Sequence, residues 1–267
     1  MSFDGKTLSW SLREQVIEVR LHRAPNNEIG SATLDELERL AALIRAGADG
    51  ARAVLIYSEQ PGFCAGADLR ELHQGMADRR ANGLPVDGDV RVFVDRIHEV
   101  FDTLDTAPLT TIAAVHGVCF GGGFELALTA DMIVADKSAR FCFPELRLGL
   151  VPGFGGIPRL NRDVGNAVVR DLLFTGRSLN AKRAQALGLV AQVVPRNEAL
   201  PAARRLAEQV CRFDAQTVSA AKAFAKPLPV DELAEERELF CRLITQPAVA
   251  EALQKFVDSE DIRPYLP

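Results

Sequence analysis

Apolar residues recur with two different periods along this chain, and these periods predict strands that alternate with helices. Residues 16–21 alternate between apolar and polar positions and are rich in β-branched side chains, so we expect a strand there. Residues 53–57, 110–115 and 132–135 are short apolar runs of the kind found in buried strands. Strands separated by helices favour parallel pairing and an α/β fold.

Helical spacing dominates the rest of the sequence. Ser31 is expected to cap a helix that runs to residue 46, while the Gly- and Pro-rich segment 140–156 is expected to be irregular. Other helices are expected over 68–80, 89–104, 122–129, 165–174, 180–187, 197–212, 215–224, 231–243 and 248–258. We therefore expect a core domain over residues 1–197 and a helical region over 198–267.

Composition narrows the classes of protein that fit. Of 267 residues, 48% are hydrophobic and 25% are charged, as in an ordinary globular protein. The net charge of −5 provides no positive field for nucleic acid, so local arginines and lysines would have to meet an anionic ligand. No apolar stretch approaches the ~20 residues that cross a bilayer, and residues 1–6 lack the apolar core of a signal peptide. With five cysteines and no C-x-x-C pair, we expect a cytoplasmic protein with reduced thiols.

Small residues connect the strand predicted at 53–57 to the next helix. Segment 62–69 reads GFCAGADL, and its small side chains would let a ligand lie against the main chain. The Ala67 N–H could then point at an anion, with Asp68 near the helix start. A tight turn that needs small residues only for packing is the alternative.

Three consecutive glycines, Gly121–Gly123, stand between a predicted strand and a predicted helix. No Gly-Lys-Ser/Thr follows, and contiguous glycines do not match a dinucleotide fingerprint, so neither phosphate motif applies. One backbone N–H from this loop and one from segment 62–69 could form an oxyanion hole for a carbonyl that becomes an enolate. Close packing of the helix on the strand is the alternative.

Two glutamates follow backbone-bending elements and form the most informative pair in the chain. Glu125 interrupts an otherwise apolar helix, where an unpaired charge is costly, and Glu145 follows Phe143-Pro144. Two carboxylates of different protonation state can act in turn as base and acid. Singly, each could be a surface carboxylate or half of an ion pair. The four histidines are scattered without metal-ligand spacing, and no G-x-S-x-G elbow is present.

Together these segments resemble the crotonase family, the enoyl-CoA hydratase/isomerase superfamily. The matching motifs are FCAGADL at 63–69, GGGFELA at 121–127 and PELRLGLVPGFGG at 144–156. The similarity runs over most of residues 10–260. It implies a crotonase-type α/β fold, which is a spiral of ββα turns with a helical C-terminal region. Members commonly assemble through that region, so a homotrimer or homohexamer is expected.

The resemblance also implies roles for individual residues. The N–H groups of Ala67 and Gly122 would hold the thioester carbonyl, Glu125 would activate the water that attacks C3, and Glu145 would supply or take the proton at C2. The implied activity is that of an enoyl-CoA hydratase, a lyase that adds water reversibly and syn to a trans-2-enoyl-CoA. Acyl-CoA is the substrate, and no metal or further cofactor is implied. Residues implied to contact the substrate or CoA are Arg23, Ala65, Gly66, Asp68, Leu69, Arg70, Gly121, Pro144 and Gly153.

The chain departs from the family pattern where the nucleotide would bind. Pro61 stands where relatives often have a lysine, Arg70 keeps the charge of another family lysine, and an acidic run at 258–261 replaces the usual basic tail. An acyl chain on a carrier protein therefore stays open as the substrate. A Δ3–Δ2 isomerase that depends on Glu145, and a non-catalytic acyl-CoA binder, are further alternatives.

Overall fold

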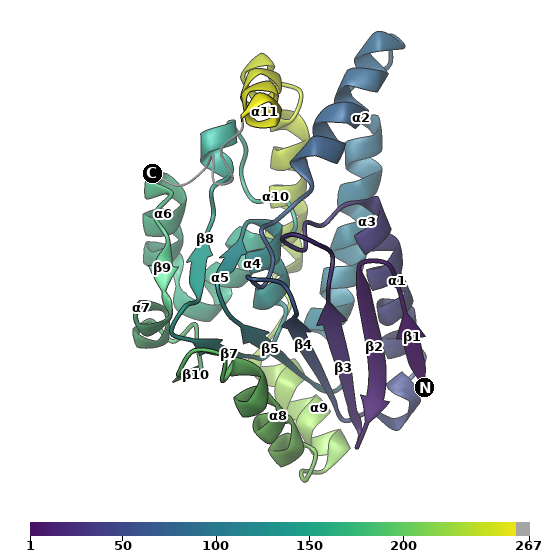
Figure 1. Ribbon diagram of the computed structural model, residues 1–267, viewed down its shortest axis with the longest axis vertical. Coiled ribbons are helices and arrows are strands. Elements are labelled where there is room, and N and C mark those ends of the chain that lie inside the picture. The colour runs from purple at the N-terminus through teal and green to yellow at the C-terminus, as the bar shows by residue number, and fades with distance from the viewer. Residues whose placement is uncertain (260–267) are drawn as a thin grey trace.

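The computed structural model of the protein describes residues 1–259, and a seven-stranded sheet lies at its centre (Figure 1). Strand order in this sheet follows chain order throughout, and the three strands that occur between its later strands in the sequence form a smaller sheet. From the third strand onward all neighbours are parallel. The strands of this sheet are β1 (Ser2–Asp4), β2 (Leu8–Arg13), β3 (Val16–Leu21), β4 (Ala53–Ser58), β5 (Thr110–Val115), β7 (Met132–Asp136) and β10 (Gln192–Val194). The predicted strands are thus confirmed.

The antiparallel edge of the sheet was not predicted. Strand β2 pairs with β3 through a hairpin whose two turn residues, Glu14 and Gln15, have φ of 45° and 69°. Such positive φ values normally call for Gly or Asn, so the turn carries no recognisable sequence signal. Strand β1 is short and mostly exposed, and it is held by the stacking of Phe3 on Trp10 at a ring distance of 4.2 Å.

Alternate side chains of the central strands face two separate cores. Val54 and Ile56 of β4 join the larger core with helices α1 (Ser31–Arg45) and α3 (Gly88–Asp105). Ala53 and Leu55 face the opposite way and pack with α8 (Ala199–Val210). The period of two therefore explains why runs such as AVLIY are apolar throughout, because both faces of the sheet are covered.

The chain also forms a second, smaller sheet of three short strands. It consists of β6 (Val118–Phe120), β8 (Arg140–Cys142) and β9 (Leu179–Asn180). The expectation that residues 140–156 are irregular was wrong in part. That segment contains β8 and the 3-10 helix η2 (Glu145–Leu148), and α5 (Gly156–Val164) begins at its end. The Gly and Pro residues mark the connections between these short elements.

Most predicted helices are confirmed with small shifts at their ends, but α5 was missed and the cap of α1 was wrong. Gly30 is the N-cap, and the Ser31 N–H donates to the Glu71 carboxylate at 3.0 Å. Helices α2 and α11 lie at the top of Figure 1, and α8 and α9 at the bottom. The remaining helices are α2 (Leu69–Ala81), α4 (Gly122–Leu128), α6 (Asn166–Thr175), α7 (Ala181–Ala186), α9 (Ala215–Ala225), α10 (Val230–Leu243) and α11 (Pro247–Asp258).

The C-terminal part is helical from residue 199 onward, as expected, through the last described residue of α11. The apolar residues of α10 and α11, including Phe240, Val249 and Leu253, pack within the chain against α2, α3 and the segment that follows Glu145. The proposed boundary between 1–197 and 198–267 stays a prediction, and residues 260 and 261 of the acidic run at 258–261 lie outside the described residues. No helix within residues 1–259 has the length and hydrophobicity to span a membrane.

Candidate active site

Two loops from the two sheets lie side by side and bring two backbone amides together. Cys64 and Cys119 form a parallel bridge, and the Phe120 N–H donates to the Cys64 carbonyl at 3.0 Å. A Cβ atom placed on Gly122 would lie 3.4 Å from the Ala67 nitrogen. Neither the Ala67 nor the Gly122 N–H has an acceptor among the described residues. Both amides are therefore free to bind one ligand atom.

Each glycine of the triple run has its own steric reason. Gly121 has φ of 50°, and a Cβ there would lie 2.6 Å from Glu145 Oε1. A Cβ on Gly122 would strike the Phe154 ring at 2.7 Å, and one on Gly123 would strike the Cys64 carbonyl oxygen at 2.4 Å. The packing explanation thus holds for Gly123, whereas Gly121 gives the Glu145 carboxylate room beside the free amides.

Helix α4 carries Glu125 into the protein interior, where the side chain is 2% exposed. Its Oε1 accepts hydrogen bonds from the Phe154 N–H at 2.7 Å and the Gly156 N–H at 2.9 Å. Burial raises the pKa of Glu125 to about 7, although these backbone hydrogen bonds and the Arg159 guanidinium pull it down. A carboxyl group with this pKa can exchange a proton near neutral pH.

Glu145 begins η2 and faces the same space from the other side. Its Oε2 is buried and has no hydrogen-bond partner within residues 1–259. Burial first, and then the charge of Glu125, raise the pKa of Glu145 well above its usual value. Because Glu125 has N–H donors and Glu145 Oε2 has none, Glu125 ionises first and Glu145 keeps its proton.

A cavity of about 60 Å³ joins these groups, and we call it the catalytic cavity. Both acids, both free amides and most of the residues predicted to contact substrate line it. Its walls are formed by Ala65, Gly66, Ala67, Leu69, Leu72, Gly121, Gly122, Glu125, Pro144, Glu145, Leu148, Leu150, Gly153, Phe154 and Phe240.

Three predicted contact residues lie outside the catalytic cavity. Asp68 caps α2 by accepting from the Glu71 N–H at 3.0 Å and forms an ion pair with Arg23. Arg70 donates to the Val257 carbonyl at 3.1 Å and lies over the Phe256 ring. Both arginines are thus already engaged within the chain.

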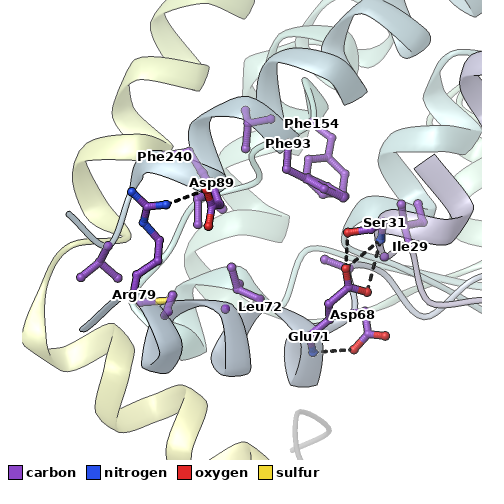
Figure 2. Close-up of a pocket in the computed structure, with 17 residues that line it drawn as sticks. Ile29, Ser31, Asp68, Glu71, Leu72, Arg79, Asp89, Phe93, Phe154 and Phe240 are labelled. Atoms are coloured by element: carbon purple, nitrogen blue, oxygen red, sulfur yellow. Dashed lines mark hydrogen bonds and ion pairs between the residues drawn. The ribbon is translucent and has the colours of Figure 1, made fainter. Parts of the chain in front are cut away.

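A larger cavity of about 380 Å³ adjoins the first between α2 and α3, and we call it the α2–α3 cavity (Figure 2). The two cavities share Ala67, Leu72, Phe154 and Phe240. Its polar lining comprises Ser31, Asp68, Glu71, Arg79 and Asp89, and its other walls are largely apolar.

Three phenylalanines from different parts of the chain form the aromatic wall around the two cavities. Of the phenylalanines near the motifs, Phe154 lines both cavities, whereas Phe124, Phe141 and Phe143 belong to the core. Phe93 and Phe240 were missed because they come from α3 and α10, far from the motifs in sequence, and only the tertiary packing brings them here.

Comparison with known proteins agrees with this geometry. The family model described as enoyl-CoA hydratase/isomerase matches residues 11–263. Carnitinyl-CoA dehydratase of Proteus mirabilis is 35% identical over 221 residues, which are 82% of this chain and 79% of that protein. The mitochondrial methylglutaconyl-CoA hydratase of Homo sapiens is 39% identical over 162 residues, covering 60% of this chain and 45% of that protein.

Solved structures give the same result. A carnitinyl-CoA hydratase from Mycobacterium avium superposes with a TM-score of 0.78 at 25% identity and covers 96% of this chain and 97% of its own. An enoyl-CoA hydratase from Bacillus anthracis superposes with a TM-score of 0.74 at 29% identity and covers 95% and 96% of the two chains. The crotonase-like α/β fold is therefore confirmed, and the chain belongs to the enoyl-CoA hydratase/isomerase family.

Proposed function

We propose that this protein catalyses the reversible syn addition of water to a trans-2-enoyl-CoA thioester. The observation that carries the proposal is that two backbone amides without an acceptor in the described part of the chain, and two buried carboxyl groups of unequal acidity, line one small cavity. The chemistry needs an electrophile activated at its carbonyl, a base for water and an acid for carbon, and these groups match each need.

The free amides suit the carbonyl end of the substrate. As water adds at C3, negative charge moves onto the thioester oxygen, and the N–H groups of Ala67 and Gly122 would hold that oxygen. Gly122 opens α4, so the partial positive charge of a helix N-terminus adds to the effect. Removal of one donor from such a hole typically costs about 3–4 kcal/mol of transition-state stabilisation.

The two acids suit the proton transfers. Ionised Glu125 would take a proton from water as the oxygen bonds to C3, and protonated Glu145 would deliver a proton to C2 as the enolate collapses. The opposite order of the same steps gives dehydration. Proton exchange between the acids restores the starting state, so the cycle is balanced and runs on the chain's own groups, without a metal.

The α2–α3 cavity suits the acyl tail because it opens from the catalytic cavity. Its lining includes three carboxylates and one guanidinium, but Asp89 pairs with Arg79 at 2.6 Å and Asp68 pairs with Arg23. Glu71 accepts hydrogen bonds from Ser31 and has no ion-pair partner in the described part of the chain. This residual negative charge favours neutral or cationic tails over tails that end in a carboxylate. Carnitinyl-CoA dehydratase and methylglutaconyl-CoA hydratase are named for acyl groups of opposite charge. This preference therefore bears on which of the two acyl groups the substrate of this protein resembles.

A Δ3–Δ2 enoyl-CoA isomerase is the second candidate. The observation that favours it is that Glu145 Oε2 has no hydrogen-bond partner among the described residues, since one carboxyl group beside an enolate hole can move a proton between C2 and C4. The isomerase would tolerate loss of Glu125, whereas the hydratase would not. A carrier-protein substrate would be favoured if crotonyl-pantetheine were hydrated as fast as crotonyl-CoA.

An ultraviolet assay tests the proposal. Hydration of crotonyl-CoA removes the conjugated double bond, so absorbance should fall with the wild type and stay constant with Glu125→Gln and Glu145→Gln. If the wild type leaves crotonyl-CoA unchanged but converts a 3-enoyl-CoA into the conjugated isomer, the protein is an isomerase and the hydratase proposal is wrong. A wild type that binds acyl-CoA and converts neither compound would be a binding protein.

A further inference from the structure

The backbone N–H groups of the turn at Gly153–Ile157, which leads into α5, donate hydrogen bonds to two carboxylates from distant parts of the chain. Glu125 of α4 accepts the Phe154 and Gly156 N–H groups. Glu236 of α10 accepts the next amide, that of Ile157, at 2.8 Å. Glu236 therefore binds the same short turn immediately beside the catalytic carboxylate.

Carbonyl groups of the turn are also held from two sides. His98 of α3 donates from Nε2 to the Gly153 carbonyl at 2.9 Å. The fully buried Arg159 guanidinium donates to the carbonyls of Phe154 at 3.1 Å and Gly155 at 3.3 Å. The turn thus has little freedom to move without breaking a buried hydrogen bond.

Helix α10 packs directly on the turn on either side of Glu236. A Cβ on Gly153 would lie 2.5 Å from the Phe240 ring, and one on Gly155 would lie 2.6 Å from a Leu233 methyl carbon. Leu233, Glu236 and Phe240 follow one another at helical spacing, so a single face of α10 meets the turn. Glu236 is the only polar member of this set, and it is 5% exposed.

The second carboxyl oxygen of Glu236 makes this arrangement costly. Its Oε2 is buried without a hydrogen-bond partner among residues 1–259. An apolar side chain would fill the same space without that desolvation cost. The feature that an apolar side chain could not provide is the acceptor for the Ile157 N–H.

We propose that Glu236 is a positioning residue for Glu125: by holding the Ile157 amide it keeps the Phe154 and Gly156 amides pointed at the catalytic carboxylate. The catalytic part of this inference rests on the hydratase function proposed above, whereas the ordering of the turn does not. Without Glu236 the turn loosens, Glu125 loses the hydrogen bonds that stabilise its ionised form, and water activation weakens.

The charged groups around the pair determine the expected sign of the effect. Glu125 of α4 and Arg159 of α5 act on Glu236, while Arg159 and Arg237 act on His98 of α3. Asp102 and Asp105 of α3 both pair with Arg159. Burial, followed by the charge of Glu125, raises the pKa of Glu236 well above its usual value, which favours the neutral form of Glu236. Burial lowers the pKa of His98 to about 4, so His98 stays neutral. A neutral Glu236 acts through its carbonyl oxygen, which a glutamine would reproduce.

The test compares Glu236→Ala, which removes the acceptor, with Glu236→Gln, which keeps it. Glu235→Gln is the matched control, because Glu235 is the exposed neighbour on the same helix. Hydrogen–deuterium exchange without substrate should be about 10-fold faster at the Phe154 and Gly156 amides in Glu236→Ala alone. In hydration assays this variant should lose about 10- to 100-fold in kcat with KM within about 3-fold, and the acid limb of its pH profile should move to higher pH. Glu236→Gln should restore all three quantities.

If Glu236→Ala does not fold, Glu236→Leu takes its place, since leucine preserves most of the volume and also lacks an acceptor. Unchanged exchange at the turn in the variant without an acceptor would overturn the proposal, as would a Glu236→Gln variant that is as impaired as Glu236→Ala. The exchange result stands even if the wild type does not hydrate crotonyl-CoA, so a failure of the proposed function is distinguishable from a failure of the positioning role.

Discussion

The catalytic cavity and the α2–α3 cavity share a wall but are built from different materials. The first is about 60 Å³, and backbone amides, glycines and two carboxyl groups line it together with apolar side chains such as Leu148 and Leu150. The second is about 380 Å³ and is formed by side chains of α2, α3 and α10, and its charged residues Glu71 and Asp89 are exposed. We infer that the chemistry depends on rigidly held backbone amides and buried acids. The preference for one acyl tail over another depends instead on solvent-exposed side chains of the α2–α3 cavity.

The largest effect should come from the acids of the catalytic cavity. Glutamine keeps the size of glutamate but cannot take or give the proton, so Glu125→Gln and Glu145→Gln should each lower kcat by about 10²- to 10⁴-fold. Steady-state hydration of crotonyl-CoA measures this, with Glu99→Gln on the exposed face of α3 as the control. A Glu125→Gln variant within a few-fold of the wild type would remove Glu125 from the mechanism.

A steric test of the same cavity should give the next largest effect. In Gly121→Ala the new methyl group would meet Glu145 Oε1, and the residue would be strained at φ of 50°. We expect about a 100-fold loss of kcat, of the size seen when a preorganised group is displaced. Gly50→Ala separates strain from displacement, because Gly50 has φ of 77° and no described residue other than its chain neighbours lies within 4 Å of its Cβ position. Equal losses of activity in the two variants would show that displacement of Glu145 is not the cause.

The unequal acidity of the two acids predicts a bell-shaped pH dependence. Glu125 must be ionised to act as a base, so kcat/KM should rise with pH through its pKa of about 7. Glu145 must be protonated to act as an acid, and burial and the charge of Glu125 raise its pKa, so activity should fall only at higher pH. A plateau that extends down to pH 5 would show that the two acids do not divide the roles in this way.

The smallest effect is expected in the α2–α3 cavity. Glu71→Gln removes a carboxylate that has no ion-pair partner within residues 1–259. Exposure limits the gain for a carboxylate-ended tail to about 0.5–1 kcal/mol, or roughly 2- to 5-fold. The measurement is the ratio of kcat/KM for a carboxylate-ended and an uncharged enoyl-CoA, with activity on crotonyl-CoA nearly unchanged. A ratio that does not move, or an equal change for both substrates, would remove Glu71 from tail selection.

Contiguous motifs allowed the catalytic cavity to be predicted from sequence. The amides of Ala67 and Gly122 and the carboxyl groups of Glu125 and Glu145 were expected to converge, and the structure brings them to one cavity. In each motif a glycine or proline lies within a few positions of a candidate site residue. The local sequence therefore indicates the backbone geometry that the proposed chemistry needs.

The supporting residues could not be predicted in the same way. Glu236 and Phe240 read as ordinary positions of an amphipathic helix, and Arg159 lies in α5, which was not predicted. The roles of Glu236 and Phe240 arise from contacts between segments more than 50 positions apart, as in the hydrogen bond of Glu236 to Ile157. Periodicity can assign such residues to the buried face of a helix, but it does not identify the residues that this face contacts.

Hydration of crotonyl-CoA in oxygen-18 water, followed by mass spectrometry of the acyl product, tests the central claim most directly. The account predicts that the wild type forms a 3-hydroxyacyl-CoA with one heavy oxygen at C3, and that Glu125→Gln forms almost none. A wild-type product without heavy oxygen, or equal incorporation by the Glu125→Gln variant, would contradict it.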